Sequence, residues 1–399
     1  MTTPRLLDLA ARSLGGSVMH ADDESFGEKE NLVLDAPAVV APGRFGHKGE
    51  LVDGWETRRR RGAPGHDRAL VRLGAPGVVR SVDIDTTGFT GNFPTHARVE
   101  GCGLDGHPSV AELQAPEVEW EMLAPWVSLR GDDHHVVPVS SPTRVTHVRL
   151  SMRPDGGIAR LRVHGRALPD PRTLDGLTVD LAARELGGLV EASSDDFYTR
   201  ASVLNRPDLA RSMGEGWETR RRRDDGHDWV VLRLAAAARP EMVEIDTSYF
   251  VLNASAEVEL WGAHRETAPE PQSPEWFPVL PRLRLQPDTR HRFRVPPGAE
   301  MTHVRLDAFP DGGISRVRLP GRVVGPGRRL LGLRWLNALP VGQLRAVLAD
   351  AGIQAVAPLL AARPLTEHPT GTGGLGSVVP ELSDAESARL LALVAGPRG

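Results

Sequence analysis

The sequence predicts an all-β protein in which two β-sandwich units follow each other and a short helical segment comes last. Three observations predict this architecture. Five sequence blocks occur twice in the same order, and the apolar residues within each copy form short alternating or β-branched runs. Only residues 326–399 carry sustained helical spacing of their apolar residues.

The repeated blocks divide the chain into two homologous units. The shift between the copies falls from 172 residues (8 to 180) to 156 residues (146 to 302), so the second copy has lost short pieces, as surface loops allow. The first copies are DLAARSLGG (8–16), GWETRRRR (54–61), GHD (65–67), IDT (84–86) and THVRL (146–150). We therefore expect domains at 1–168 and 169–325 and a separate tail at 326–399.

Each unit has the pattern of an antiparallel sandwich. Runs such as LVRL (70–73), VRSVDIDT (79–86) and MTHVRL (301–306) are typical of strands, and clusters of Gly, Pro, Asp and Asn separate them. The PDGG segments predict hairpin turns. At the start of each unit, DLAAR predicts a short helix that Asp8 caps at its N-terminus and Gly15 closes at its C-terminus.

The tail differs from both units. RWLNALPVGQLRAVLADAG and SDAESARLLALVAG have helical periodicity, and Ser383 with Glu386 forms a capping-box pattern at the start of the second segment. The stretch PTGTGGLGS between them is typical of a flexible linker.

The charge balance excludes several functional classes. The chain has 48 Lys and Arg against 52 Asp and Glu, so no basic field favours nucleic acid as a partner. No stretch is apolar enough for a membrane span, and the first thirty residues lack the pattern of a secretory signal. The single cysteine, Cys102, cannot form an intramolecular disulfide, and we expect it in the core. A cytoplasmic location fits these features best.

The repeated arginine run is the candidate binding element. If the run is extended, its side chains alternate between one face with Trp55, Thr57, Arg59 and Arg61 and another with Glu56, Arg58 and Arg60. One interpretation is a solvated edge strand in which Glu56 pairs with a neighbouring arginine. The alternative is a site for a small anion, because an arginine binds a carboxylate through two parallel hydrogen bonds. Retention of the run in both copies favours the anion site.

Further polar residues follow the run. His66 and Asp67 lie either in a turn in which Asp67 caps backbone N–H groups, or in a site in which His66 is an acid/base group or a ligand near neutral pH. Asp85 and Thr86 end a strand and lead into the loop that carries Asn92, which is either an ordinary strand end or part of a site. If only one unit is active, we favour the first, since it alone has the Gly-Asn-Phe sequence in this loop. The histidine and cysteine spacings predict no metal site, although a weakly bound divalent metal stays open.

Taken together, these blocks resemble the allantoicase family. The resemblance rests on residues 26–33, 42–67, 82–102 and 146–165 and on the weaker second copy, and it spans about four fifths of the chain. It implies two tandem jelly-roll domains of the galactose-binding-like type and a homo-oligomer. It also implies hydrolysis of allantoate to (S)-ureidoglycolate and urea in purine degradation, with no cofactor. One departure is Arg68, where the family has a Trp, as the second unit has at Trp229.

The tail resembles the beginning of the ureidoimidazoline decarboxylase family through WLNALPVGQLRAVL. The His-Pro catalytic stretch of that family has no counterpart here, because EHP (367–369) is too short and comes too early. We interpret the tail as a truncated remnant or a docking element.

The implied reaction suggests roles for the candidate residues. Arg58 or Arg59 would bind the carboxylate, while His66 and Asp67 would transfer protons, with Asp85 or Glu56 as alternatives. Asn92 would hold a ureido carbonyl, and Trp55 and Thr86 would complete the substrate contacts. The competing hypothesis is a non-catalytic binding module for a small anionic or carbohydrate ligand. Stacking on sugars calls for exposed aromatic side chains, and aromatics are only 5% of the chain.

Overall fold

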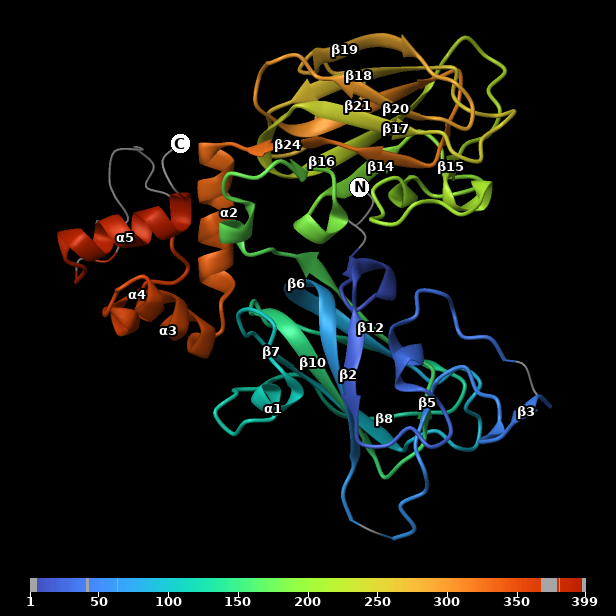
Figure 1. Cartoon of the computed structure of the whole chain (residues 1–399), viewed down its shortest axis with the longest axis vertical. Coiled ribbons are helices and arrows are strands. Elements are labelled where there is room, and N and C mark those ends of the chain that lie inside the picture. Colours follow the sequence, from blue (N-terminus) through green and yellow to red (C-terminus); the bar gives the residue numbers. More distant parts are fainter. Residues whose placement is uncertain (1–5, 41–42, 63, 367–378, 380, 397–399) are drawn as a thin grey trace. The chain divides into compact units, whose positions relative to one another are not determined.

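Figure 1 shows the computed structural model of the chain, which describes residues 6–40, 43–62, 64–366, 379 and 381–396. Contacts divide it into two compact units, the first built on the residues up to Pro169 and the second on Asp170–Arg334. Among the described tail residues, those from Trp335 to 366 join the first unit, and those from Ser387 to Gly396 join the second.

The first unit is an eight-stranded antiparallel sheet folded into a sandwich, in the order β1-β12-β6-β10-β7-β8, with β2 and β9 also pairing with β6. The strands of this sheet are β1 (Leu7–Asp8), β2 (Ser17–Ala21), β6 (Asp67–Asp85), β7 (His96–Cys102), β8 (Glu121–Ser128), β9 (His134–Pro138), β10 (Arg144–Arg153) and β12 (Arg160–Ala167). Two short ladders lie beside it, one of β3 (Phe45–Gly46) with β4 (Gly49–Glu50) and one of β5 (Trp55–Glu56) with β11 (Gly157–Ile158), and a single helical turn is α1 (Val110–Leu113).

Strand β6 belongs to both layers of the sandwich. Its first part pairs with β2 and β10, and from Gly77 onward it pairs with β12 and, near its end, β9. Asp67 lies opposite Met152 and Asp85 lies opposite Arg160. Because only a short connection joins β10 to β12, both ends of β6 come to the same end of the sandwich. The β5–β11 ladder lies in this connection, so the repeated run also reaches this end.

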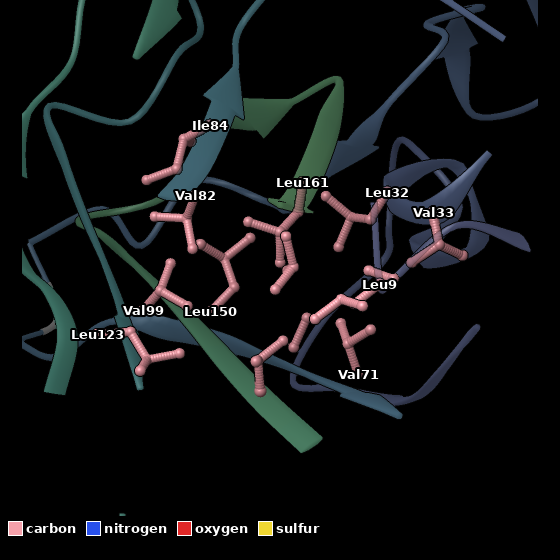
Figure 2. Close-up of a cluster of buried hydrophobic side chains, with 14 of the residues drawn as sticks. Leu9, Leu32, Val33, Val71, Val82, Ile84, Val99, Leu123, Leu150 and Leu161 are labelled. Carbon is pink, nitrogen blue, oxygen red and sulfur yellow. The ribbon is translucent and has the colours of Figure 1, made fainter. Parts of the chain in front are cut away.

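The core of the first unit fills the space between the two layers. Figure 2 shows Val82, Ile84, Leu150 and Leu161 pointing into it together with side chains of the N-terminal segment, including Leu9. All five are 0% exposed. Burying one aliphatic side chain of this size contributes about 1.5–3 kcal/mol, so this cluster is the main support of the sandwich.

The second unit repeats the architecture with one interruption. Its sheets run β13-β24-β16-β21-β18-β19 with β14 attached, and β20-β17-β23. The strand that corresponds to β6 is broken into β16 and β17 at Pro240, which has no N–H for a ladder hydrogen bond. The strands are β13 (Val179–Asp180), β14 (Leu189–Ser193), β15 (Trp217–Glu218), β16 (Asp228–Pro240), β17 (Met242–Asp246), β18 (Glu257–Ala263), β19 (Phe277–Arg284), β20 (Arg290–Arg294), β21 (Met301–Phe309), β22 (Gly313–Ile314), β23 (Arg316–Arg318) and β24 (Pro320–Val323).

The tail is helical, as its spacing predicts. Its helices are α2 (Gly325–Ala338), α3 (Val341–Asp350), α4 (Val356–Ala361) and α5 (Asp384–Ala395). The predicted capping box is present, because Ser383 Oγ donates to Glu386 at 2.7 Å and accepts the Glu386 N–H at 3.3 Å. The predicted linker and the EHP segment lie outside the described residues. Among the helices that the structure describes, none is long and apolar enough to cross a membrane.

The helix predicted at the start of each unit is wrong. Residues Arg12–Leu14 form only a single 3₁₀ turn after β1, closed as predicted by Gly15 at φ 95°. The carboxylate of Asp8 accepts the N–H groups of Ala10 and Val163, so it joins the chain start to β12 instead of capping the turn. Tertiary hydrogen bonds therefore replace the expected local ones.

Cys102 lies in the core as predicted, at 2% exposure. Burial raises the pKa of its thiol to about 12, so it is a protonated core residue at neutral pH.

Candidate active site

Trp55 anchors the repeated run at the end of the first sandwich. Its side chain is 0% exposed, and its indole N–H donates to the Asp23 carbonyl at 2.7 Å. Next along the chain, Thr57 exchanges hydrogen bonds with Gly156, donating its N–H to the carbonyl at 3.0 Å and accepting the Gly156 N–H on its hydroxyl at 3.3 Å. These contacts hold both sides of Glu56, whose side chain lies between two buried neighbours.

The arginine run leaves the strand directly after Glu56, so the predicted alternation of faces is wrong. The N–H of Arg58 donates to Asp23 at 2.8 Å, and the N–H of Arg60 donates to Asp155 at 2.7 Å. These side-chain acceptors take the place of a neighbouring strand. Arg60, and not Arg59, is the arginine that turns inward.

The four arginines differ in how their guanidinium groups are used. Arg58 is 77% exposed and faces Asp23 at 3.3 Å. Arg60 donates to the Asp67 carboxylate at 2.7 Å and to the His66 carbonyl at 2.9 Å. Arg59 and Arg61 are exposed and make no hydrogen bond or ion pair with any residue that the structure describes. Arg59 therefore presents an unused cation beside Glu56.

Glu56 and Asn92 form the polar centre of this end of the sandwich. The Asn92 side-chain amide donates to Oε1 of Glu56 at 2.7 Å. Burial raises the pKa of Glu56, against the opposing effects of the Asn92 hydrogen bond and the Arg59 charge. A carboxyl group with a raised pKa is suited to accept and return a proton near neutral pH.

The loop that carries Asn92 is held in place by its backbone. The Gly157 N–H donates to the Asn92 carbonyl at 2.8 Å. Gly156 has φ 140°, and a Cβ atom there would lie 2.5 Å from the Asn92 carbonyl oxygen. Only glycine allows the PDGG turn to approach the loop this closely. The turn that the sequence predicts therefore also positions Asn92.

Asp85 and Thr86 hold the start of the same loop through buried hydrogen bonds. Thr86 is 0% exposed, and its hydroxyl donates to the carbonyls of Arg130 and Asp133 at 2.7 and 3.0 Å. Asp85 is 4% exposed and accepts the Thr87 N–H at 2.8 Å. Both side chains are engaged inside the protein.

His66 lies apart from Glu56. Its ring meets the edge of Trp126 with 5.8 Å between ring centroids. Burial lowers the pKa of His66, and the charges of Arg98 and Arg68 lower it further, so the ring is neutral at pH 7. In the described part of the chain, no hydrogen bond or ring contact joins His66 to Glu56.

The structure thus sorts the residues that the sequence singled out. Trp55 and Thr86 are both 0% exposed, and their contact with a substrate stays a prediction. Asp67 is 5% exposed and is paired with Arg60, so it holds the run instead of facing solvent. Glu56 and Asn92 are brought together, and the exposed Arg58 and Arg59 lie beside them.

Two aspartates that position the arginine run were not predicted from the sequence. Asp23 and Asp155 accept the backbone N–H groups of Arg58 and Arg60. The signal was present, since both recur at the shifts of their blocks, as Asp195 and Asp311. Asp195 and Asp311 accept the corresponding N–H groups of Arg220 and Arg222 at 3.2 and 3.0 Å.

One acidic cluster in the described residues has ligand-like spacing. Carboxylate oxygens of Glu24, Glu28 and Glu30 lie within 4.8 Å of one another. Lys29 Nζ lies 2.8 Å from Glu30, and Lys48 Nζ lies 2.7 Å from Glu28. Lysine ammonium groups already balance these carboxylates, so the cluster does not stand out as a metal centre.

Comparison with known proteins places this geometry in a family. The model of the allantoicase repeat matches residues 7–168 and again 179–324. The chain belongs to the allantoicase family. A probable allantoicase of Nocardia farcinica is 50% identical over 321 residues, which cover 80% of this chain and 95% of that protein. A probable allantoicase of Streptomyces avermitilis is 47% identical over 82% of this chain and 88% of its own length.

A solved structure agrees with this assignment. The crystal structure of allantoicase from Saccharomyces cerevisiae matches with a TM-score of 0.65 and 26% identity, covering 80% of this chain and 94% of that one. The predicted pair of jelly-roll domains is therefore confirmed. The two matches to the allantoicase repeat end before α2, so the tail lies outside both copies. Its likeness to a decarboxylase stays a prediction.

Proposed function

We propose that this chain hydrolyses allantoate to (S)-ureidoglycolate and urea, and that Glu56, Asn92 and Arg59 of the first unit carry the reaction. Membership of the allantoicase family supports the reaction. The observation that supports the site is the hydrogen-bonded pair of Glu56 and Asn92 next to the unused Arg59 guanidinium. Asp67 and Asp85 are buried and hold neighbouring groups, so the proposal leaves them out of the proton transfers and keeps His66 as a second proton-transfer candidate beside Glu56.

The reaction sets three demands. Allantoate has a central carbon that bears a carboxylate, a hydrogen and two ureido groups. One carbon–nitrogen bond breaks, a carbon–oxygen bond to water forms, and the departing urea nitrogen takes up a proton. The site must therefore bind a carboxylate, deliver a proton to the leaving nitrogen and take one from water.

Arg59 meets the first demand. Its guanidinium is exposed and carries no partner among the described residues, so binding a substrate carboxylate breaks no existing ion pair. Arg58 adds positive charge at the same place but faces Asp23. We propose that Arg59 is the main carboxylate ligand and that Arg58 supports it.

Glu56 meets the demand for proton transfer. The Asn92 hydrogen bond fixes Oε1, which leaves Oε2 to face a bound substrate. Because burial raises the pKa of this group, its protonated form persists to higher pH than for an exposed glutamate. Asn92 has a second amide hydrogen, which can be offered to a ureido carbonyl.

His66 is the candidate for the remaining proton transfer. Its lowered pKa keeps the ring neutral, and a neutral imidazole accepts a proton. It lies beside Asp67 at the same end of the sandwich, where Arg60 holds its carbonyl.

The test is urea release from allantoate by the purified full chain. We expect Glu56→Gln to reduce kcat/KM at least about a hundredfold, since removal of a general acid or base costs that much. Arg59→Ala should raise KM, whereas Arg61→Ala, a matched change at another exposed arginine of the same run, should leave it near that of the unmodified chain. Equal effects of the two arginine variants would contradict the specific role of Arg59. Absence of urea release by the folded, unmodified chain would contradict the function.

We also propose that the chain forms a homo-oligomer in the cytoplasm. Several large apolar side chains are well exposed, such as Phe45 at 72% and Val39 at 66%, and such surfaces are often covered by another subunit. The lone, reduced Cys102 suits a reducing compartment. Light scattering after size exclusion measures the mass, and a monomer at micromolar concentration would contradict the oligomer. Cell fractionation tests the location.

A further inference from the structure

The second unit keeps the polar centre of the first unit. Asn253 donates its side-chain amide to Oε1 of Glu218 at 2.7 Å, as Asn92 does to Glu56. Trp217 is 0% exposed and donates to the Asp195 carbonyl at 2.9 Å, as Trp55 does to Asp23. The two centres therefore share the Glu–Asn hydrogen bond and the tryptophan anchor, and Asn253 also donates to Met213 Sδ at 3.2 Å.

The arginines of the second unit are also used in the same way. Arg220 faces Asp195 at 3.6 Å, and Arg222 donates to Asp228 at 3.0 Å. Arg221 corresponds to Arg59, is exposed, and makes no hydrogen bond or ion pair with the residues whose structure is given. In both units, an exposed arginine without a hydrogen-bond or ion-pair partner among the described residues thus follows the Glu of the Glu–Asn pair by three positions.

Fold stability alone does not account for the Glu218–Asn253 pair. The backbone of this segment is already held by Asp195 and Asp311 and by Thr219, whose hydroxyl accepts the Gly312 N–H at 2.7 Å. A single part-buried hydrogen bond adds about 1 kcal/mol to these contacts. A pair that adds little stability but recurs beside an unused cation points to ligand binding.

The rim of the second centre differs from that of the first. At the three positions where the first unit has Gly88, Thr90 and Gly91, the second unit has Tyr249, Val251 and Leu252. Their side chains are exposed by 47%, 58% and 96%. The loop leads directly into Asn253, so these apolar groups lie beside the polar centre.

Tyr249 has an unfavourable backbone conformation at this position in the loop. Its φ is 69°, where the first unit has Gly88 at φ 83°. A bulky residue in the left-handed region costs about 1 kcal/mol or more. The Tyr249 N–H donates to Asp288 at 2.8 Å, which holds the conformation. An exposed aromatic kept at such a cost indicates a contact outside the unit's own fold.

We infer that the second unit carries its own binding site for an N-carbamoyl acid with an apolar substituent. The inference rests on the proposed function, which defines how the Glu–Asn pair and the arginine recognise a ureido acid. Arg221 binds the carboxylate, Glu218 and Asn253 bind the ureido group, and the Tyr249 loop contacts the substituent. The corresponding loop of the first unit has Gly88, Thr90 and Gly91 in place of these three side chains, and the apolar group beside Gly88 there is Val40 of an earlier segment.

Isothermal titration of the full chain tests the inference with two probes that carry a single ureido group, N-carbamoylglycine and N-carbamoylphenylalanine. We expect a site that prefers the phenylalanine derivative and that weakens about tenfold in Arg221→Ala, as loss of one charge-assisted contact predicts. Arg223→Ala, at another exposed arginine of the same run, is the matched control and should bind normally. Glu218→Gln keeps the shape of the site and should also weaken binding. Thermal unfolding verifies that each variant is folded.

The outcomes separate this inference from the proposed function. Normal urea release together with unchanged titrations in Arg221→Ala and Glu218→Gln would overturn the second site and leave the function intact. Loss of urea release in Glu56→Gln with retained binding of N-carbamoylphenylalanine would support both. If Leu252→Ser lowers the oligomer mass and leaves the titration unchanged, the apolar rim is a subunit contact, and the assigned ligand class is overturned.

Discussion

The side chain of Asn92 donates a 2.7 Å hydrogen bond to Oε1 of Glu56, joining a loop at the end of the first sandwich to a two-residue strand. The bond lowers the pKa of Glu56 against the larger upward effect of burial. The protonation of Glu56 is therefore adjustable through Asn92.

Asn92→Asp should move the acid limb of the pH profile of kcat/KM to higher pH. The change removes a donor and places a second carboxylate against Glu56, which disfavours the ionised form of the pair and raises its apparent pKa. The profile of urea release against pH measures the shift. Asn253→Asp makes the same change in the second unit and should leave the limb in place. A limb that does not move in Asn92→Asp would show that Glu56 is not the titrating group.

Asp67→Asn should destabilise the first unit by about 1–3 kcal/mol, because the half-buried Arg60 guanidinium loses its carboxylate. The corresponding Asp228→Asn should cost less, since Arg222 keeps a second partner in Asp224 at 2.9 Å. Chemical denaturation of both variants gives the comparison. A larger loss in Asp228→Asn would contradict this account of the arginine run.

His147 should make the first unit sensitive to acid. The residue is 3% exposed, and burial lowers its pKa to about 4, with the charges of Arg72 and His107 acting in the same direction. Below pH 6.5 the unfolded chain binds a proton that the folded unit does not, so stability is lost as pH falls from about 6.5 towards 4. The full loss amounts to about 3 kcal/mol.

His147→Gln removes the titrating group, and the fall in melting temperature between pH 7 and pH 4 should become smaller. Both proteins have the same carboxylates, so the difference between their two pH dependences reports on His147 alone. Identical pH dependence in the two proteins would show that His147 is protonated in the folded unit as easily as in the unfolded chain.

Asp53→Asn should cost about 3 kcal/mol, the amount expected when one partner of a buried ion pair is removed. Arg160 is 1% exposed and contacts both carboxylate oxygens of Asp53 at 2.8 Å. The neutral amide leaves this guanidinium buried without its counter-charge. Asp35→Asn, at an exposed position before β3, should change stability by less than about 1 kcal/mol. Denaturant midpoints for the two variants decide the matter.

The features that could be predicted from the sequence are those set by residues close together in the chain. The duplication, the strands around residues 79–86 and 144–150, the PDGG turn and the Ser383 capping box all follow from residues close together in the chain. The helix at the start of each unit failed for the opposite reason. Asp8 bonds to Val163, far along the chain, and this contact outweighs the local tendency of DLAAR.

The sequence by itself determined that this protein is a duplicated β-sandwich of the allantoicase family with a Glu-Thr-Arg run in each copy. Only the tertiary structure decided how that run is used. Arg58 donates a hydrogen bond to Asp23, and Arg60 donates to Asp67 and Asp155. Arg59, beside Glu56, has no such partner among the described residues. Four identical residues in a row differ only through the partners that distant segments bring to them. Burial is also decided by distant segments, which cover Trp55 and Thr86 completely and leave Glu56 half-buried.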